Sequence, residues 1–372
     1  MNKARYIPPN MKKALFTLIL AFILFTGFGQ EQRKTENVFL ITTDGFRWKE
    51  VFGGIDSTLL NDGQYTKDAK SLKQKYWSDT LELRRSKLLP FFWKTIASKG
   101  QLHGNRDLGS LVNVTNQQWF SYPGYNEILA GFSDDEKINS NDKIDNPNTT
   151  VLEFLNQQKE LKGRIAAFST WDCFPFIINE KRTGIPVNSG KELVEGKLSP
   201  KEELLNEIQT QVPNQIADRH DFVTYHLAKE YVKNKHPKVL FLAFDETDDY
   251  AHAGNYEGYL QAAQNFDTFL KDLWDLVQSD PQYKDKTTFI ITSDHGRGIK
   301  PKSKWTDHGY KTAYSDQIWF ATMGPDTKAL GEIKTSEQLY QNQIAKTLAA
   351  FLGFDYKSNK TVGDKIELVL KK

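Results

Sequence analysis

The chain has 372 residues, a formal charge of +2 and a single cysteine, Cys173. One cysteine excludes an intrachain disulfide framework. No basic stripe interleaves with aromatic residues, so the charge gives no case for a nucleic-acid-binding surface.

The N-terminal segment has the layout of a secretory signal peptide. It reads MKKALFTLILAFILFTGFGQ from Met11 to Gln30, with two early lysines, an apolar run and small residues at the end. Cleavage is expected after Gly29. The apolar run is short for a membrane span, and an uncleaved anchor is the alternative. We therefore predict a signal peptide at 1–29, a single domain at 30–372, a periplasmic or secreted location, and no transmembrane segment after cleavage.

Short apolar runs rich in β-branched or aromatic residues predict buried strands. They span residues 37–45, 163–172, 238–248 and 287–296, with residues 316–324 as a fifth candidate. Helical periodicity lies between them and is clearest over residues 256–278. Strands that alternate with helices predict an α/β fold with a mostly parallel central sheet and helices on both faces.

Two polar stretches do not fit this alternation. Residues 52–87 and residues 181–219 are rich in charged and small residues. Long connections in compact domains are often lids or binding loops. We predict that both are lid-like insertions over the active edge of the sheet.

Acidic residues and histidines follow the predicted strands. Ligands of parallel sheets bind beyond the carboxyl ends of the strands, so these side chains are expected at one edge. An isolated aspartate there is often only a cap or turn residue, but here six possible ligands recur together. Mixed Asp and His ligation suits zinc, or less selectively manganese or iron. Six ligands suit two ions about 3.5–4 Å apart. The six are Asp44, Asp248, His252, Asp294, His295 and His308.

Five motifs carry a resemblance to a known family. They are TTDGFR (42–47), SYPGYNEILAG (121–131), DETDDYAHAG (245–254), TSDHGR (292–297) and DHGY (307–310). In this order they resemble the motifs of the alkaline phosphatase superfamily, and most closely its nucleotide pyrophosphatase/phosphodiesterase (type I phosphodiesterase) branch. The resemblance spans roughly residues 37–325.

The resemblance implies a role for each of these residues. One metal ion would be held by Asp248, His252 and His308, and the other by Asp44, Asp294 and His295. Ser121, two residues before Pro123, would be the nucleophile that bridges two divalent ions, expected to be zinc, and would form a phosphoserine intermediate. Asp245, Glu246 and Asp249 would then support the ligands or face solvent.

The sequence also departs from that branch. The branch generally has Thr where Ser121 stands and Asn where Gly124 stands. Its phosphoryl-gripping asparagine has four candidates here, and the loop before His308 is short. Cations within that loop could contact phosphate or lie in solvent. The asparagines are Asn113, Asn126, Asn139 and Asn141, and the cations are Arg297, Lys302 and Lys304.

These features predict an exported two-metal phosphoric-ester hydrolase that acts on a small phosphate ester. Residues 112–132 contain no Lys or Arg, and an aromatic neighbourhood could pack a second ester substituent, so diesters or pyrophosphates are expected over monoesters. The aromatic residues are Trp119, Phe120, Tyr122, Tyr125 and Trp171.

Three alternatives stay open. A phosphomonoesterase of the same superfamily would need a cation from the loop before His308. A sulfatase is disfavoured, because Tyr125 stands where its motif requires Arg. A non-catalytic, metal-stabilised binding protein would carry the same ligands without turnover.

Overall fold

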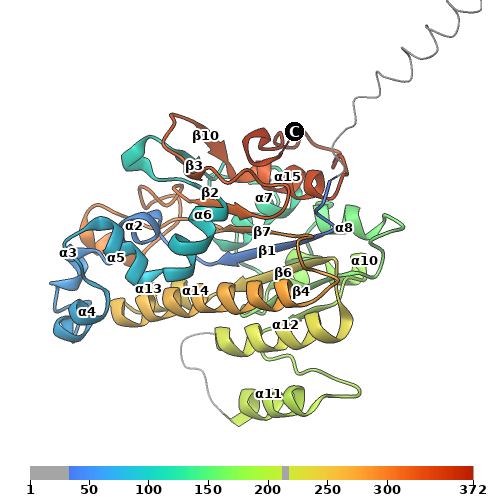
Figure 1. Cartoon of the computed structure of the whole chain (residues 1–372), viewed down its shortest axis with the longest axis horizontal. Helices are drawn as coiled ribbons and strands as arrows, with labels where there is room; N and C mark the ends of the chain where they lie inside the picture. Colours follow the sequence, from blue (N-terminus) through green and yellow to red (C-terminus); the bar gives the residue numbers. More distant parts are fainter. Residues whose placement is uncertain (1–32, 212–217, 372) are drawn as a thin grey trace, which may run out of the picture. The chain divides into compact units, whose positions relative to one another are not determined.

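Strand β1 (Asn37–Thr43) lies inside an eight-stranded sheet in the computed structural model, with the order β5-β4-β6-β1-β7-β8-β2-β9 (Figure 1). β1 pairs in parallel with β6 and β7, and β4 pairs in parallel with β6 and β5. Only β8 runs against its neighbours β7 and β2. The mostly parallel sheet predicted from the sequence is therefore confirmed. The other strand bounds are β2 Gly100–His103, β4 Ile165–Ser169, β5 Val187–Ser189, β6 Val239–Phe244, β7 Thr287–Thr292, β8 Phe320–Met323 and β9 Gly331–Glu332.

The structure describes residues 33–211 and 218–371. The described elements belong to one unit, Lys34–Lys371. The predicted signal peptide lies outside the described residues. Across the described ranges, no helix has the length and apolar character that crossing a membrane requires.

Helices cover both faces of the sheet, as predicted. Alternate residues of β1 point to opposite sides: Phe39 and Ile41 pack in one hydrophobic cluster, and Val38 and Leu40 in another. Figure 1 shows α12 and α14 along one side of the strands and α7, α8 and α15 on the other. Their bounds are α7 Ser121–Ala130, α8 Val151–Asn156, α12 Asp221–Lys235, α14 Tyr256–Ser279 and α15 Ile344–Phe351.

The two polar stretches are built mainly of short helices. Residues 52–87 begin with the end of α2 and contain α3, α4 and most of α5, while the described part of residues 181–219 contains most of α10, β5 and α11. Their role as lids stays a prediction. The bounds are α2 Trp48–Gly53, α3 Ser57–Leu60, α4 Ala69–Tyr76, α5 Leu81–Leu88, α10 Glu180–Thr183 and α11 Pro200–Gln211. A separate two-stranded sheet pairs β3 (Leu111–Asn113) with β10 (Gln338–Tyr340).

Every predicted strand extends beyond the observed strand, and the difference matters most for the site in the prediction over residues 238–248. β6 ends at Phe244, and the acidic segment after it forms helix α13 (Glu246–His252) instead of extending the strand. Asp221 explains the change, because its carboxylate accepts hydrogen bonds from the backbone N–H groups of Asp245 and Glu246 at 3.0 and 3.3 Å. Asp248 and His252 therefore reach the site from one face of a helical turn, four residues apart.

Candidate metal and nucleophile site

The central strands end level with one another, and this sets the position of the site. In the register of the sheet, Thr42 lies beside Thr292 and Thr43 beside Phe244. Asp44 follows β1 directly, and Asp294 comes two residues after the end of β7. The expectation that these carboxylates meet at one edge of the sheet agrees with this geometry.

The first group of side chains, called here the β1–β7 cluster, consists of Asp44, Asp294 and His295. Nε2 of His295 lies 3.1 Å from Oδ1 of Asp44 and 3.5 Å from Oδ2 of Asp294. Both of these carboxylate oxygens are buried and lack a hydrogen-bond partner among the described residues. Nδ1 of His295 donates to the carbonyl of Gly296 at 2.8 Å, which turns Nε2 toward the carboxylates.

The second group, called here the α13 cluster, consists of Asp248, His252 and His308. Nε2 of His252 lies 2.9 Å from Oδ2 of Asp248 and 2.9 Å from Nε2 of His308. Nε2 of His308 lies 3.8 Å from Oδ1 of Asp248. Nδ1 of His308 donates to the carbonyl of Trp119 at 3.3 Å, so its Nε2 is the atom presented to the cluster.

The two clusters meet at His295. Its Nε2 lies 3.8 Å from Oδ1 of Asp248. Potential ligand atoms of Asp248, His295 and His308 lie within 4.8 Å of one another, as do those of Asp44, Asp294 and His295. The structure thus brings all six predicted ligands into one connected group and places His295 between the two sets.

The electrostatics of the group favour a bound cation. Burial, and then the charge of Asp44, holds the pKa of Asp294 well above its ordinary value. Burial lowers the pKa of His295, but the charge of Asp294 and the close approach and charge of Asp44 outweigh it and raise that pKa to about 10. Buried carboxylates with unpartnered oxygens are costly unless a proton or a metal ion balances them. The donor set of carboxylates and imidazoles fits divalent zinc, manganese or iron.

Ser121 opens helix α7 beside the β1–β7 cluster. Its Oγ lies 3.4 Å from Nε2 of His295, and the residue is 7% exposed. Gly124 allows α7 to lie close to the backbone of Asp294, because a Cβ at that position would collide with the carbonyl oxygen of Asp294. One turn after Ser121, Tyr125 donates its hydroxyl to Oδ2 of Asp44 at 3.1 Å. Tyr125 was not predicted as a partner of a ligand, although its i,i+4 spacing from Ser121 places it on the same helix face.

The start of α7 offers fewer free N–H groups than a helix terminus usually does. The N–H of Tyr122 donates to Oδ1 of Asn141 at 3.0 Å, and Pro123 has no N–H. Of the four candidate asparagines, Asn141 is the one that contacts this turn. Asn113, Asn126 and Asn139 bond elsewhere, to Asp316, to Asn146 and Asn148, and to the carbonyl of Glu136 respectively.

The three cations predicted as possible phosphate contacts are each paired with a carboxylate of the protein. Lys302 pairs with Asp62, and Lys304 pairs with Asp307 at 2.8 Å. Arg297 is 1% exposed, so the alternative that it lies in a solvated loop is wrong for this residue. Its guanidinium contacts Asp248 directly.

Gly45 meets a backbone requirement at the centre of the group. Its φ is +56°, in the left-handed region that glycine adopts without strain. A Cβ there would lie 2.5 Å from Oδ1 of Asp248 and 2.8 Å from Nη1 of Arg297. The glycine therefore leaves the space in which these two side chains meet.

Helix α13 carries two further carboxylates, those of Glu246 and Asp249. Oε1 of Glu246 lies within hydrogen-bond distance of Nδ1 of His220, at 2.8 Å. Burial raises the pKa of Asp249 to about 9, with the charge of Asp248 adding to the effect. His220 and Asp221 were not predicted to take part, because no spacing in the sequence connects them with α13.

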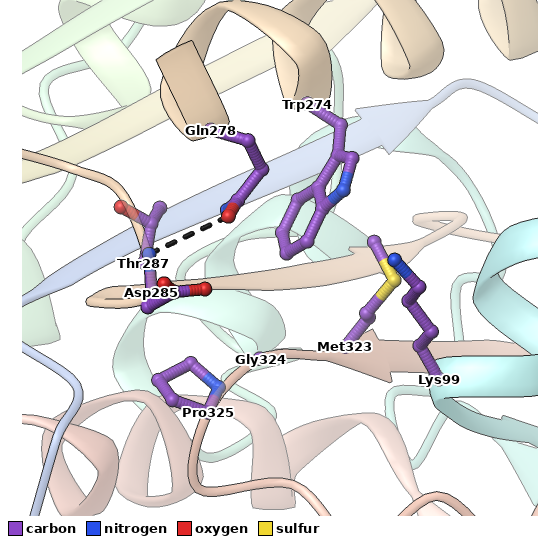
Figure 2. A pocket seen from close by; sticks show the side chains of 8 residues that line it. All are labelled: Lys99, Trp274, Gln278, Asp285, Thr287, Met323, Gly324 and Pro325. Carbon is purple, nitrogen blue, oxygen red and sulfur yellow. Dashed lines mark hydrogen bonds between the residues drawn. The ribbon is translucent and has the colours of Figure 1, made fainter. Parts of the chain in front are cut away.

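A separate cavity of about 180 Å³ is shown in Figure 2. Its wall includes Trp274, Met323 and Thr287, the first residue of β7. Asp294 lies beyond the other end of that strand, and none of the eight residues drawn belongs to the two clusters. This cavity is therefore separate from the candidate site.

The fold and the site define a class of α/β metalloenzymes with the architecture of the alkaline phosphatase superfamily. The chain belongs to the metalloenzyme superfamily, whose family model matches residues 170–356. A search of curated proteins found no match.

Several solved structures have folds similar to that of this chain. The wild-type alkaline phosphatase PafA aligns over 91% of this chain and 99% of its own, with a TM-score of 0.62 and 11% identity. The lipoteichoic acid synthase LtaP from Listeria monocytogenes aligns over 90% and 75%, with a TM-score of 0.53 and 14% identity. The phosphonate monoester hydrolase SpPMH from Silicibacter pomeroyi aligns over 86% and 73%, with a TM-score of 0.52 and 12% identity. At these identities the likeness concerns the fold, and the expected phosphodiesterase branch is not singled out.

Proposed function

We propose that this protein is an exported phosphoric-ester hydrolase with two divalent metal ions and Ser121 as its nucleophile. One observation carries the proposal: Oγ of Ser121 lies 3.4 Å from Nε2 of His295, the member of the β1–β7 cluster that also lies 3.8 Å from Asp248 of the α13 cluster. Matches to an alkaline phosphatase and a phosphonate monoester hydrolase support hydrolysis at phosphorus. Export rests on the signal-peptide layout of residues 1–29.

Each set of residues has a part in the proposed reaction. The α13 cluster would hold one ion and the β1–β7 cluster the other. Bound there, the ions would supply Lewis acidity and neutralise charge on the serine, leaving-group and phosphoryl oxygens. Ser121 attacks phosphorus from the start of α7, the bond between phosphorus and the ester oxygen breaks, and the alcohol departs with the proton that the Ser121 hydroxyl gives up, which leaves a phosphoserine. Water then cleaves the phosphoserine bond, which restores the hydroxyl of Ser121.

Asn141 is proposed to bind a phosphoryl oxygen. Its Oδ1 is taken by the N–H of Tyr122, so its Nδ2 donor lies close to the turn that carries Ser121. This donor would replace the backbone N–H groups that Tyr122 and Pro123 cannot offer.

We propose that diesters or pyrophosphates are preferred over monoesters. A monoester brings an additional negative charge, which an enzyme usually meets with a dedicated Arg or Lys. Arg297, Lys302 and Lys304 are each paired with a carboxylate of the protein, so none of them is free to bind the additional charge of a monoester. The partly buried Trp119 and Trp171 pack against the core near α7 and leave aromatic surface for a second substituent.

Replacement of the nucleophile tests the reaction. Ser121→Ala should leave both metal ions bound, because the serine lies outside both ligand sets, while kcat falls by several orders of magnitude. Metal content and turnover of p-nitrophenyl esters are measured on the same preparation. Near-normal turnover in this variant would mean that Ser121 is not the nucleophile.

A substrate comparison tests the specificity. The mature chain is assayed with bis-nitrophenyl phosphate, nitrophenyl phosphate and nitrophenyl sulfate in one buffer and metal condition. The expected order of kcat/KM places the diester first. A higher value for the monoester contradicts the diester preference, a higher value for the sulfate favours the sulfatase alternative, and no turnover of any ester favours the binding protein.

A further inference from the structure

Arg297 is a fully buried cation within the candidate metal site. It lies two residues after His295, and its side chain has no exposed surface. A buried guanidinium is tolerated when its donors are satisfied in a defined geometry. Its partners therefore indicate what this arginine does.

The three nitrogen atoms of the guanidinium reach three different groups. Nη1 contacts Oδ1 of Asp248. Nε donates to the carbonyl of Trp305 at 2.9 Å, and Nη2 donates to the carbonyl of Thr306 at 2.5 Å. One planar side chain thus connects a predicted ligand on α13 with two consecutive carbonyls of the loop that leads to His308.

The loop is held at other points as well. The N–H of Gly298 donates to the carbonyl of Asp307 at 3.0 Å, which closes the loop directly before His308. The ring of Trp305 is fully buried and packs edge-on against Tyr65 and Tyr256, at 5.4 Å from each. Arg297 connects this loop directly with Asp248, so the arginine helps to set how the loop faces α13.

The contact also gives the two carboxylate oxygens of Asp248 different partners. Oδ1 faces Arg297, while Oδ2 lies 2.9 Å from Nε2 of His252. A ligating carboxylate that is held by a hydrogen bond on one oxygen presents the other in a fixed direction. Arg297 therefore orients Asp248 and, through the loop, brings His308 toward the same point.

We propose that Arg297 is a positioning residue that assembles the α13 cluster by tying the loop before His308 to Asp248. This inference rests on the proposed two-metal function. The buried position and engaged donors of Arg297 argue against a direct contact with substrate. The competing idea is that its positive charge merely repels a cation at Asp248.

Metal binding distinguishes these two roles. Arg297→Gln and Arg297→Lys are compared with the wild type and with Lys304→Ala, a matched change in the same loop at a residue that pairs with Asp307. Zinc stoichiometry and affinity are measured by titration against a competing chelator. A positioning role predicts that Arg297→Gln weakens one of two sites by about 10–100-fold, as for lost partners of ligands in other metalloproteins, while the second site is retained.

Zinc affinity in Arg297→Lys should be nearly as low as in Arg297→Gln, because one ammonium group cannot bridge a carboxylate and two carbonyls in the geometry of the guanidinium. Hydrogen exchange of residues 298–307 should become faster in both Arg297 variants before metal is added. The retained second site shows that the variants are folded. Lys304→Ala should bind two ions with wild-type affinities.

The outcomes separate the inference from the proposed function. Two sites of unchanged or tighter affinity in the Arg297 variants, with two sites in the wild type, overturn the positioning role alone. A wild-type protein that binds fewer than two ions contradicts the two-metal function, and the inference with it. Full recovery in Arg297→Lys would show that charge alone is required, which also overturns the bridging role.

Discussion

At the scale of single residues, the sequence motifs predict His295 as a ligand but do not reveal that it lies between the two clusters. The resemblance assigns it to one metal together with Asp44 and Asp294, yet its Nε2 also lies 3.8 Å from Asp248. His308, in contrast, contacts the α13 cluster and the carbonyl of Trp119. The two histidines should therefore respond differently to replacement.

We predict that His308→Ala lowers metal binding from two equivalents to one, because the β1–β7 cluster keeps its three side chains. His295→Ala should weaken both sites, because it removes a ligand from one cluster and opens the space beside Asp248. Elemental analysis after dialysis against excess chelator-buffered zinc measures both effects. Loss of both ions in His308→Ala, or of one ion only in His295→Ala, would contradict this assignment.

At the scale of elements, one buried carboxylate holds the segment that leads into α7. Glu127 accepts hydrogen bonds from the N–H groups of Thr115, Asn116 and Asn342, at 2.8–3.1 Å. It also accepts from the side chains of Thr115 and Asn116 at 2.9 and 2.8 Å. The segment from Thr115 to Ser121 is thereby held against the helix that it precedes.

We predict that Glu127→Ala lowers the free energy of unfolding by about 3 kcal/mol, because several buried donors lose their acceptor. Turnover should fall at temperatures where the variant is still folded, since Ser121 is no longer held in place, while metal content stays at two equivalents. Urea unfolding and activity assays check this. Asp135→Ala is the control: Asp135 accepts from the N–H of Gln117 in the same segment but is partly exposed. A control variant as impaired as Glu127→Ala would argue against a specific role of the buried anchor.

At the scale of the whole molecule, the burial of His103 is expected to make stability depend on pH in the acid range. His103 ends β2, has no exposed surface, and packs against Phe320 with ring centroids 5.8 Å apart. Its Nε2 lies 3.1 Å from Oε1 of Gln101. Burial lowers the pKa of His103 from 6.5 to about 4, since the apolar surroundings disfavour the imidazolium.

The unfolded chain binds a proton at this histidine below pH 6.5, and the folded chain does so only near pH 4. The contribution of neutral His103 to the free energy of unfolding is complete above pH 6.5 and is lost as the pH falls toward 4. The total loss is on the order of 3 kcal/mol. We predict that His103→Phe flattens the dependence of unfolding free energy on pH between 6.5 and 4, measured by urea titration of metal-loaded protein. The comparison at pH 8 reports the packing change alone. An unchanged slope below pH 6.5 would show that His103 does not titrate in this window.

Sequence patterns alone determined the α/β class, the central strands and the residues that gather at the site. Asp44, Asp294 and His295 follow apolar strands, and parallel strands deliver their carboxyl ends to one edge whatever the details of packing. The resemblance of SYPGYNEILAG to a superfamily motif likewise implied Ser121 as the nucleophile, two residues before Pro123. These are local signals, or consequences of parallel pairing, and they do not depend on the rest of the chain.

Only the tertiary structure decided how the parts meet. The segment after β6 becomes a helix because Asp221, more than twenty residues earlier, accepts its first N–H groups. Arg297 is buried because the fold brings the carbonyls of Trp305 and Thr306 and the carboxylate of Asp248 around it. Asn141 is distinguished from the other asparagines only by its contact with Tyr122. Each of these outcomes depends on partners that are distant in the chain or joined by an irregular loop, where hydrophobic periodicity carries no information about contacts.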